Sequence, residues 1–251
     1  VFMDRIERFG VSTEETWRIF RIMAEFVEGF EELATIGPAV SIFGSAVAPR
    51  THKYYKLAEK TAAILAKAGF AVISGGGGGI MEAANKGAAK VGGKSIGLNI
   101  DLPHQQIPNT YQNLNLHFKY FFCRKVMFLK YANGFIAFPG GFGTLDEFTE
   151  ALVLIQTFKQ AHFPVILMCS EYWQGFVKWI RDVMMNKHHY IDKKDMDVFT
   201  VCDDPQQAAD IIINFRKSGA KSGIQEPPGI KKSQNNMSCE QCSYRLRTKK
   251  S

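Results

Sequence analysis

The amino-acid sequence predicts an α/β protein built on a Rossmann-like, doubly wound parallel sheet with an added N-terminal helix. Short apolar runs alternate along the chain with longer amphipathic segments, and glycine-rich turns follow several of these runs. That alternation is typical of a parallel sheet covered by helices. With 251 residues, of which 46% are hydrophobic, the chain is long enough for one large domain with terminal extensions.

Residues 1–36 are expected to form a helical extension that precedes the first strand. Ser12 or Thr13 comes before two glutamates, a pattern typical of a helix start. Apolar residues recur between Trp17 and Phe30 and form a wide band. We expect this band to pack against the chain's own domain, and a partner subunit is the alternative.

Residues 37–216 carry the alternating pattern and are expected to form the Rossmann-like domain. Apolar runs predict strands at residues 39–43, 70–73, 95–100, 114–118, 134–138, 164–168 and 198–201. Amphipathic segments predict helices at residues 54–68, 80–91, 144–158, 172–185 and 205–215, with a further helix beginning at residue 121. The polar residues 101–113 predict a surface loop.

Residues 217–251 are expected to be a basic, disordered tail, because Gly, Ser, Pro, Asn and Lys dominate there. The segment 216–251 holds nine Lys or Arg and two Glu, which is the whole formal charge of +7. The rest of the chain is electrically neutral, so nucleic-acid binding is expected, if anywhere, only in the tail.

The cysteines and the lack of long apolar runs predict a cytoplasmic protein without a membrane segment. Five scattered cysteines do not resemble a disulfide framework, and no charged-then-apolar signal segment opens the chain. No apolar run approaches the roughly 20 residues that span a bilayer. Cys239 and Cys242 are half of a zinc site at most, since no second pair lies nearby, and we expect no metal.

Two glycine-rich turns, at residues 75–79 and 140–143, each lie between an expected strand and an expected helix. The carboxyl ends of parallel strands form a ligand crevice, where helix N-termini favour anions such as phosphate. Neither turn matches the P-loop or the dinucleotide-binding fingerprint. Thr144 either caps its helix or contacts the ligand, and Asp146 and Glu147 are expected in the first helical turn.

Three segments carry a resemblance to a known family. They are the run from Gly75 through Ile80-Met81-Glu82-Ala83-Ala84-Asn85, the pair Arg124-Lys125, and the string Pro139 to Glu147, which reads Pro-Gly-Gly-x-Gly-Thr-x-x-Glu. Together they resemble the cytokinin-activating "lonely guy" phosphoribohydrolases, long labelled possible lysine decarboxylases. The Met-Glu-Ala-Ala-Asn wording is more similar to the larger bacterial relatives than to the short plant-type enzymes.

The resemblance implies hydrolysis of the N-glycosidic bond of a nucleoside 5′-monophosphate, AMP or an N6-modified AMP. The products are a free base and ribose 5-phosphate, and no cofactor is expected. The resemblance implies that Arg124 and Glu147 are the catalytic pair. It implies that the phosphate-binding turn consists of Gly140, Gly141, Gly143 and Thr144.

Further substrate contacts are expected at Gly44, Ser45, Gly76, Gly77, Glu82 and Lys125. For Glu82, exposure on the surface of its helix is an equal alternative. Arg124 either holds the nucleotide or offsets charge on the departing base, and its permanently charged fork suits both tasks.

Other functions stay open at this point. The same fold could bind a nucleotide as a non-catalytic sensor, although both expected catalytic residues are present. Lysine decarboxylation is disfavoured because nothing marks a lysine that would bind pyridoxal phosphate. The resemblance also implies a homo-oligomer, a dimer or larger.

Overall fold

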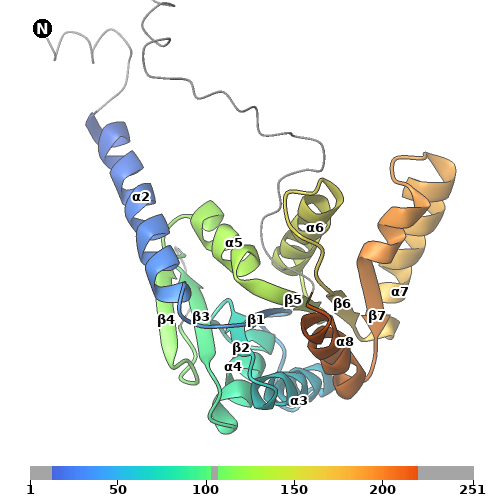
Figure 1. Cartoon of the computed structure of the whole chain (residues 1–251), viewed down its shortest axis with the longest axis horizontal. Coiled ribbons are helices and arrows are strands. Elements are labelled where there is room, and N and C mark those ends of the chain that lie inside the picture. The colour runs from blue at the N-terminus through green and yellow to red at the C-terminus, as the bar shows by residue number, and fades with distance from the viewer. Residues whose placement is uncertain (1–12, 103–106, 220–251) are drawn as a thin grey trace, which may run out of the picture.

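The computed structural model describes residues 13–102 and 107–219 and confirms the predicted α/β fold (Figure 1). Its seven strands form one sheet in the order β4-β3-β2-β1-β5-β6-β7, and all neighbouring pairs are parallel. They are β1 (Ala39–Phe43), β2 (Ala71–Ser74), β3 (Ser95–Ile100), β4 (Leu114–Phe118), β5 (Ala132–Ala137), β6 (Val165–Met168) and β7 (Phe199–Cys202).

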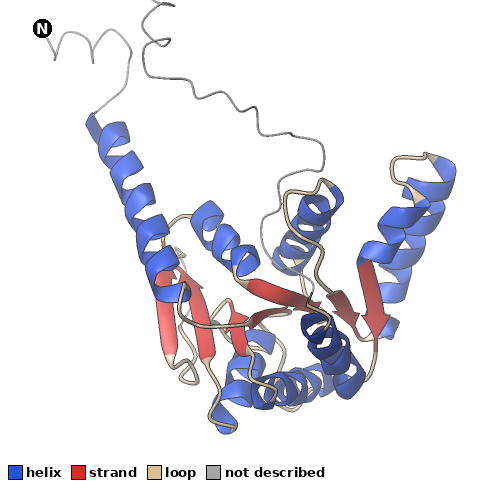
Figure 2. Cartoon of the chain, viewed as in Figure 1, coloured by secondary structure: helices blue, strands red, loops and turns tan. Residues whose placement is uncertain are grey.

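Helices cover both faces of the sheet (Figure 2). They are α2 (Thr13–Leu33), α3 (Lys53–Lys67), α4 (Ile80–Lys90), α5 (Phe121–Lys130), α6 (Phe142–Gln156), α7 (Ser170–Trp179) and α8 (Pro205–Lys217). A π-helical segment, Ile180–Lys187, continues α7, and a short 3-10 helix, Lys193–Val198, precedes β7. Among the described helices, none has the length and apolar character needed to cross a membrane.

Alternation along the buried strands divides the core into two layers. In β1, Val40 and Ile42 pack with α3, α4 and α8, whereas Ala39 and Phe43 pack on the opposite face with α5, α6 and α7. Successive side chains of a strand point to opposite faces, and both faces are covered here. This explains why the strands read as continuous apolar runs and not as alternating ones.

Helix α2 packs on its own domain along one side. A side chain at Gly29 would lie 2.6 Å from Cε of Met127, so glycine allows α2 to approach α5 closely. The carboxylate of Glu25 accepts hydrogen bonds from the main-chain N–H groups of Lys119 (2.9 Å) and Tyr120 (3.2 Å). The expected extension spans residues 1–36, of which 1–12 lie outside the described residues, as does the tail from residue 220 with its Cys239 and Cys242.

The direction in which successive strands are added to the sheet changes at β1. Strands β2 to β4 extend from one side of β1, and β5 to β7 extend from the other. The last residues of the two central strands are paired, Phe43 with Ala137. The loops that follow β1 and β5 therefore open at a switch point of the sheet, where α/β proteins bind their ligands.

Candidate active site

A cavity of about 370 Å³ opens at this switch point. The loop after β1, with Gly44 and Ser45, lines one side of it. Helices α5 and α6 supply Arg124, Thr144 and Glu147 on other sides. The chain thus brings the loop after β1, the start of α6 and the expected catalytic pair to one cavity, although these segments are far apart in sequence.

Three glycine-containing loops pack backbone against backbone beside the cavity. The N–H of Ser45 donates to the carbonyl of Pro139 (2.9 Å), and the N–H of Ile80 donates to the carbonyl of Ser45 (2.9 Å). Gly79 has φ of +61°, and a Cβ there would lie 2.2 Å from the carbonyl oxygen of Ser45. A Cβ at Gly140 would meet Oγ1 of Thr144 and the backbone of Gly44. Glycine at 79 and 140 is therefore required by packing.

Gly141 and Gly143 differ, because nothing in their own structure requires glycine. A Cβ at either position meets no atom within 4 Å, and neither residue has a positive φ. Both line the cavity. A side chain at either position would therefore extend into open space at the cavity.

Helix α6 begins at Phe142 with Gly141 as its N-cap, two residues earlier than expected. The interpretation of Thr144 as the N-cap is therefore wrong: its N–H donates to the carbonyl of Gly141 (3.0 Å) inside the first turn. Asp146 and Glu147 consequently lie in the second turn and not in the first. Thr144 is buried and lines the cavity. The free N–H groups of the helix start at Phe142 and Gly143, as at any helix N-terminus.

Glu147 is a buried carboxylate without a full set of partners. Its side chain is 4% exposed, and Oε2 has no hydrogen-bond partner among the described residues. Burial raises the pKa of Glu147 to about 7, against the opposing positive charges of Lys125 and Arg124. A carboxyl group poised near neutral pH and aimed at a cavity is typical of a functional group.

Arg124 presents its guanidinium to the same cavity from α5. The guanidinium carbon lies 5.4 Å from the ring centres of both Phe121 and Phe128, and Nη1 donates to the carbonyl of Leu98 (3.4 Å). Its Nε is buried and has no partner among the described residues. Burial lowers the pKa of Arg124 and the Glu147 charge raises it, but a guanidinium stays cationic in proteins.

Lys125 does not line the cavity. Its Nζ lies 2.8 Å from Oδ2 of Asp146 and 3.2 Å from Oε2 of Glu150, so it ties α5 to α6. Its positive charge nevertheless acts on the neighbouring Glu147. The structure therefore places Lys125 behind the cavity, where it orients the helix that carries Glu147.

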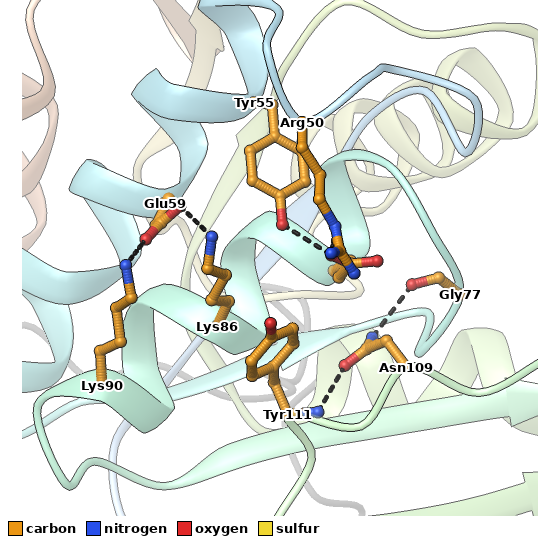
Figure 3. A network of polar contacts seen from close by, with 9 residues as sticks. Arg50, Tyr55, Glu59, Gly77, Lys86, Lys90, Asn109 and Tyr111 are labelled. Atoms are coloured by element: carbon orange, nitrogen blue, oxygen red, sulfur yellow. Dashed lines mark hydrogen bonds and ion pairs between the residues drawn. The ribbon is translucent and has the colours of Figure 1, made fainter.

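Glu82 also lies away from the cavity lining. Its Oε1 accepts hydrogen bonds from Nε of Arg50 (2.7 Å) and from the hydroxyl of Tyr55 (2.8 Å). Figure 3 shows the ends of the Arg50 and Tyr55 side chains close to one another. The glutamate thus fixes the segment after β1, which itself lines the cavity, to α3 and α4.

Gly76 and Gly77 are buried, and neither lines the cavity. Their carbonyls each accept a hydrogen bond from Nδ2 of Asn109 (3.0 Å), and Nε2 of Gln112 donates to Gly76 (2.7 Å). Asn109 reaches the glycine loop from the segment before β4 (Figure 3). These bonds anchor the loop, and from this loop it is Gly75 that lines the cavity.

Sequence reasoning missed the apolar wall of the cavity. This wall includes Phe43 from β1, Met81 from α4, and Phe128 from α5. Met81 lies inside a recognised motif and Phe43 ends an expected strand, but nothing in their spacing marks them as cavity residues. Ile100 and Leu102, at the end of β3, could have been found from the rule that strand ends line the crevice.

The comparisons with known proteins assign the family. A family model described as "Possible lysine decarboxylase" matches residues 81–212. The chain belongs to this family. It is the family to which the Pro-Gly-Gly-x-Gly-Thr-x-x-Glu string and the Arg-Lys pair point, which confirms the resemblance to the lonely guy proteins.

Further similar proteins were found among curated sequences and solved structures. A relative from Archaeoglobus fulgidus, described only as an uncharacterized protein, is 30% identical over 99 residues, 39% of this chain and 64% of the relative. The alignment thus spans less than two thirds of that relative's length. The molybdenum cofactor carrier protein of Chlamydomonas reinhardtii has a TM-score of 0.53 at 20% identity, covering 72% of this chain and 99% of its own.

The molybdenum cofactor binding protein of Rippkaea orientalis is similar, with a TM-score of 0.51 at 21% identity over 73% of this chain and 96% of that one. At such low identity these two structures show a shared fold and no more. A shared fold does not assign a function, because function depends on the residues of the site.

Proposed function

We propose that this protein hydrolyses the N-glycosidic bond of a nucleoside 5′-monophosphate, AMP or an N6-modified AMP, to a free base and ribose 5-phosphate. One observation carries the proposal. The buried carboxylate of Glu147 faces the same cavity as Arg124 and the two unobstructed glycines of the 140–143 turn. The cavity thus combines an anion-binding helix start with an acid–base group.

The phosphate is assigned to the start of α6. Its first N–H groups and the open space beside Gly141 and Gly143 suit an anion that approaches the backbone closely. Thr144, buried at the cavity, adds a hydroxyl donor. The apolar wall of Phe43, Met81 and Phe128 suits the flat face of a purine.

Glu147 is assigned to the ribose. Cleavage of an N-glycosidic bond passes through a ribose with oxocarbenium character, which a nearby carboxylate stabilises. The same carboxylate orients and deprotonates the attacking water. Because a purine leaves after protonation or hydrogen bonding on its ring, a second carboxylic acid is not needed.

A product assay tests the proposal. The purified chain is incubated with AMP, GMP, CMP, IMP and N6-modified AMP, and free base and ribose 5-phosphate are quantified by chromatography. We expect base release from at least one purine monophosphate. Absence of base from all five substrates would overturn the proposal.

The second candidate is a protein of the same fold that holds its ligand without cleaving it. The structural neighbours named as molybdenum cofactor carrier and binding proteins support this possibility at the level of the fold. In that case AMP would protect the chain from thermal unfolding and be recovered intact.

Decarboxylation of lysine fits the residues poorly. Amino-acid decarboxylation normally employs pyridoxal phosphate bound through a lysine. Lys125, the lysine next to the catalytic candidates, is held in ion pairs with Asp146 and Glu150 and does not line the cavity. We therefore assign no reaction step to that cofactor.

The pH dependence of the reaction follows from Glu147. Its pKa of about 7 means that the carboxylate form, which the proposed mechanism requires, becomes dominant only above neutral pH. We expect kcat/KM for AMP to rise between about pH 6 and pH 8, with an apparent pKa near 7. A profile that is flat from pH 5 to 8 would contradict this role of Glu147.

The substitution Gly143→Ala should change AMP affinity and the stability of the fold in opposite directions. Alanine at this helical position meets no protein atom and should stabilise α6 by about 0.5–1 kcal/mol. Because the new methyl group enters the proposed phosphate site, we expect AMP affinity to fall at least about tenfold. Calorimetric titration and thermal unfolding measure the two effects.

Gly175→Ala in α7 is the matched control for this substitution. It too meets no atom within 4 Å, and Gly175 does not line the cavity. It should raise stability and leave AMP affinity unchanged. Equal AMP affinity in both variants would show that the phosphate does not bind at this turn.

We propose a reducing cytoplasm as the setting of the reaction, which agrees with the free thiols of Cys123, Cys169 and Cys202. Burial raises the pKa of the Cys123 thiol to about 11, so the group stays neutral and unreactive.

A further inference from the structure

Helix α2 has a second apolar side that its own domain does not cover. Ile22, Phe26 and Phe30 pack against the core, whereas Trp17, Phe20 and Val27 are 64%, 57% and 61% exposed. Among the described residues, these three are large apolar side chains that are exposed to solvent. Such a run on a single helix is typical of an interaction surface.

The spacing of this exposed side is that of a helix–helix seam. Trp17, Phe20, Ala24 and Val27 are three, four and three residues apart, the a and d positions of a heptad. All four are exposed. These four residues form the seam, which runs along α2 on the side opposite to the core contacts.

The charges beside the seam indicate which partner fits it. Arg21 and Glu28 are seven residues apart, so they occupy the same heptad position, at the same edge of the seam. Both are exposed, and neither forms an ion pair within the part of the chain that is described. In an antiparallel helix pair, equivalent edge positions of the two helices face each other.

We propose that α2 pairs in antiparallel fashion with α2 of a second copy of this chain. With Ala24 close to the two-fold axis, Arg21 of each copy lies level with Glu28 of the other. The contact is self-complementary, as a two-fold symmetric interface requires. The apolar seam is buried, and both ion pairs form along one edge of it.

A parallel pair of helices does not give this match. In that arrangement the edge position of Glu28 faces Met23 of the other copy, and no opposite charges meet. The distribution of charge thus favours the antiparallel pair over the parallel one. This proposal does not depend on the reaction proposed above.

Charge reversal tests the pairing on the full-length chain. We expect the wild type to form an assembly of an even multiple of the 28.2 kDa chain mass, measured by light scattering after size exclusion. Arg21→Glu and Glu28→Arg each place like charges opposite one another, so each should weaken assembly roughly tenfold or more and halve the mass at suitable dilution. The double variant restores opposite charges and should restore assembly.

Three results would overturn the pairing. The first is a monomeric wild type, which would mean that another segment of the chain or nothing covers the seam. The second is that the single variants assemble like the wild type. The third is that the double variant assembles no better than the single ones. Circular dichroism and thermal unfolding check that each variant is folded.

A disulfide test places the two-fold axis independently. In a background with Cys239→Ser and Cys242→Ser, Ala24→Cys should give a cross-linked dimer under mild oxidation, because equivalent residues meet at the axis. Glu32→Cys, on the charged side of the same helix, is the matched control and should stay monomeric on a non-reducing gel. Equal cross-linking at both positions would contradict the proposed pairing.

Discussion

Glu147→Gln is expected to lower the rate of base release from AMP by about 10²–10⁴-fold. The amide has nearly the same shape as the carboxyl group, so the cavity and the helix around it are preserved. It has neither the charge that stabilises an oxocarbenium-like ribose nor the basicity that activates water. The measurement is chromatographic quantification of adenine under conditions where AMP saturates the wild type.

The same substitution should increase the stability of the protein at alkaline pH. The pKa of Glu147 is raised from 4.5 to about 7 in the folded chain, so the folded state holds its proton more tightly than the unfolded state. The favourable contribution of the protonated Glu147 to the free energy of unfolding is complete below pH 4.5 and is lost as pH rises through 7. Glu147→Gln avoids that loss, which amounts to about 3 kcal/mol at pH 8.

Urea unfolding of the wild type and Glu147→Gln at pH 4.5 and pH 8 measures this effect. We expect the variant to be the more stable protein at pH 8 and the difference to shrink towards pH 4.5. Glu150→Gln, one turn further along α6, is the control, because Glu150 pairs with Lys125 and does not line the cavity. A Glu147→Gln variant with wild-type turnover would exclude this residue from the chemistry.

The fold could be predicted because strands and helices carry local signals. The strands at residues 39–43, 95–100 and 114–118 have the predicted bounds, since each apolar run is bounded by glycine, proline or polar residues. The start of α6 was misplaced by two residues because Gly141, Phe142 and Gly143 read as a turn. The N-cap of α6 is Gly141, whose lack of a side chain means that no side-chain capping bond marks the helix start.

The candidate site could be predicted where recognised motifs and strand ends carry its residues, as at Gly44, Ser45 and Arg124. Gly141, Gly143, Thr144 and Glu147 share a helix, and the structure brings Arg124 to the same cavity from α5. The environment of Gly76 could not be predicted, because it depends on Asn109 and Gln112, which are 33 and 36 residues away in a segment expected to be a surface loop. Polar contacts of this range leave no periodic trace in the sequence.

Arg124→Ala is expected to lower kcat/KM by about 10²-fold or more and to move its pH dependence. The positive charge of Arg124 lowers the pKa of Glu147, so its removal raises that pKa further above 7. The ascending limb of kcat/KM should therefore shift to higher pH in the variant.

Arg124→Lys supplies the matched control, because it keeps a positive charge near Glu147 but loses the planar fork between Phe121 and Phe128. Its pH limb should stay near 7 while its activity falls. Whether the loss of activity appears in KM or in kcat then determines the role of the guanidinium group. A rise in KM alone means that it holds the nucleotide, whereas a fall in kcat means that it offsets charge on the departing base. If Arg124→Ala keeps both the rate and the pH profile of the wild type, the pairing of Arg124 with Glu147 has no part in the reaction.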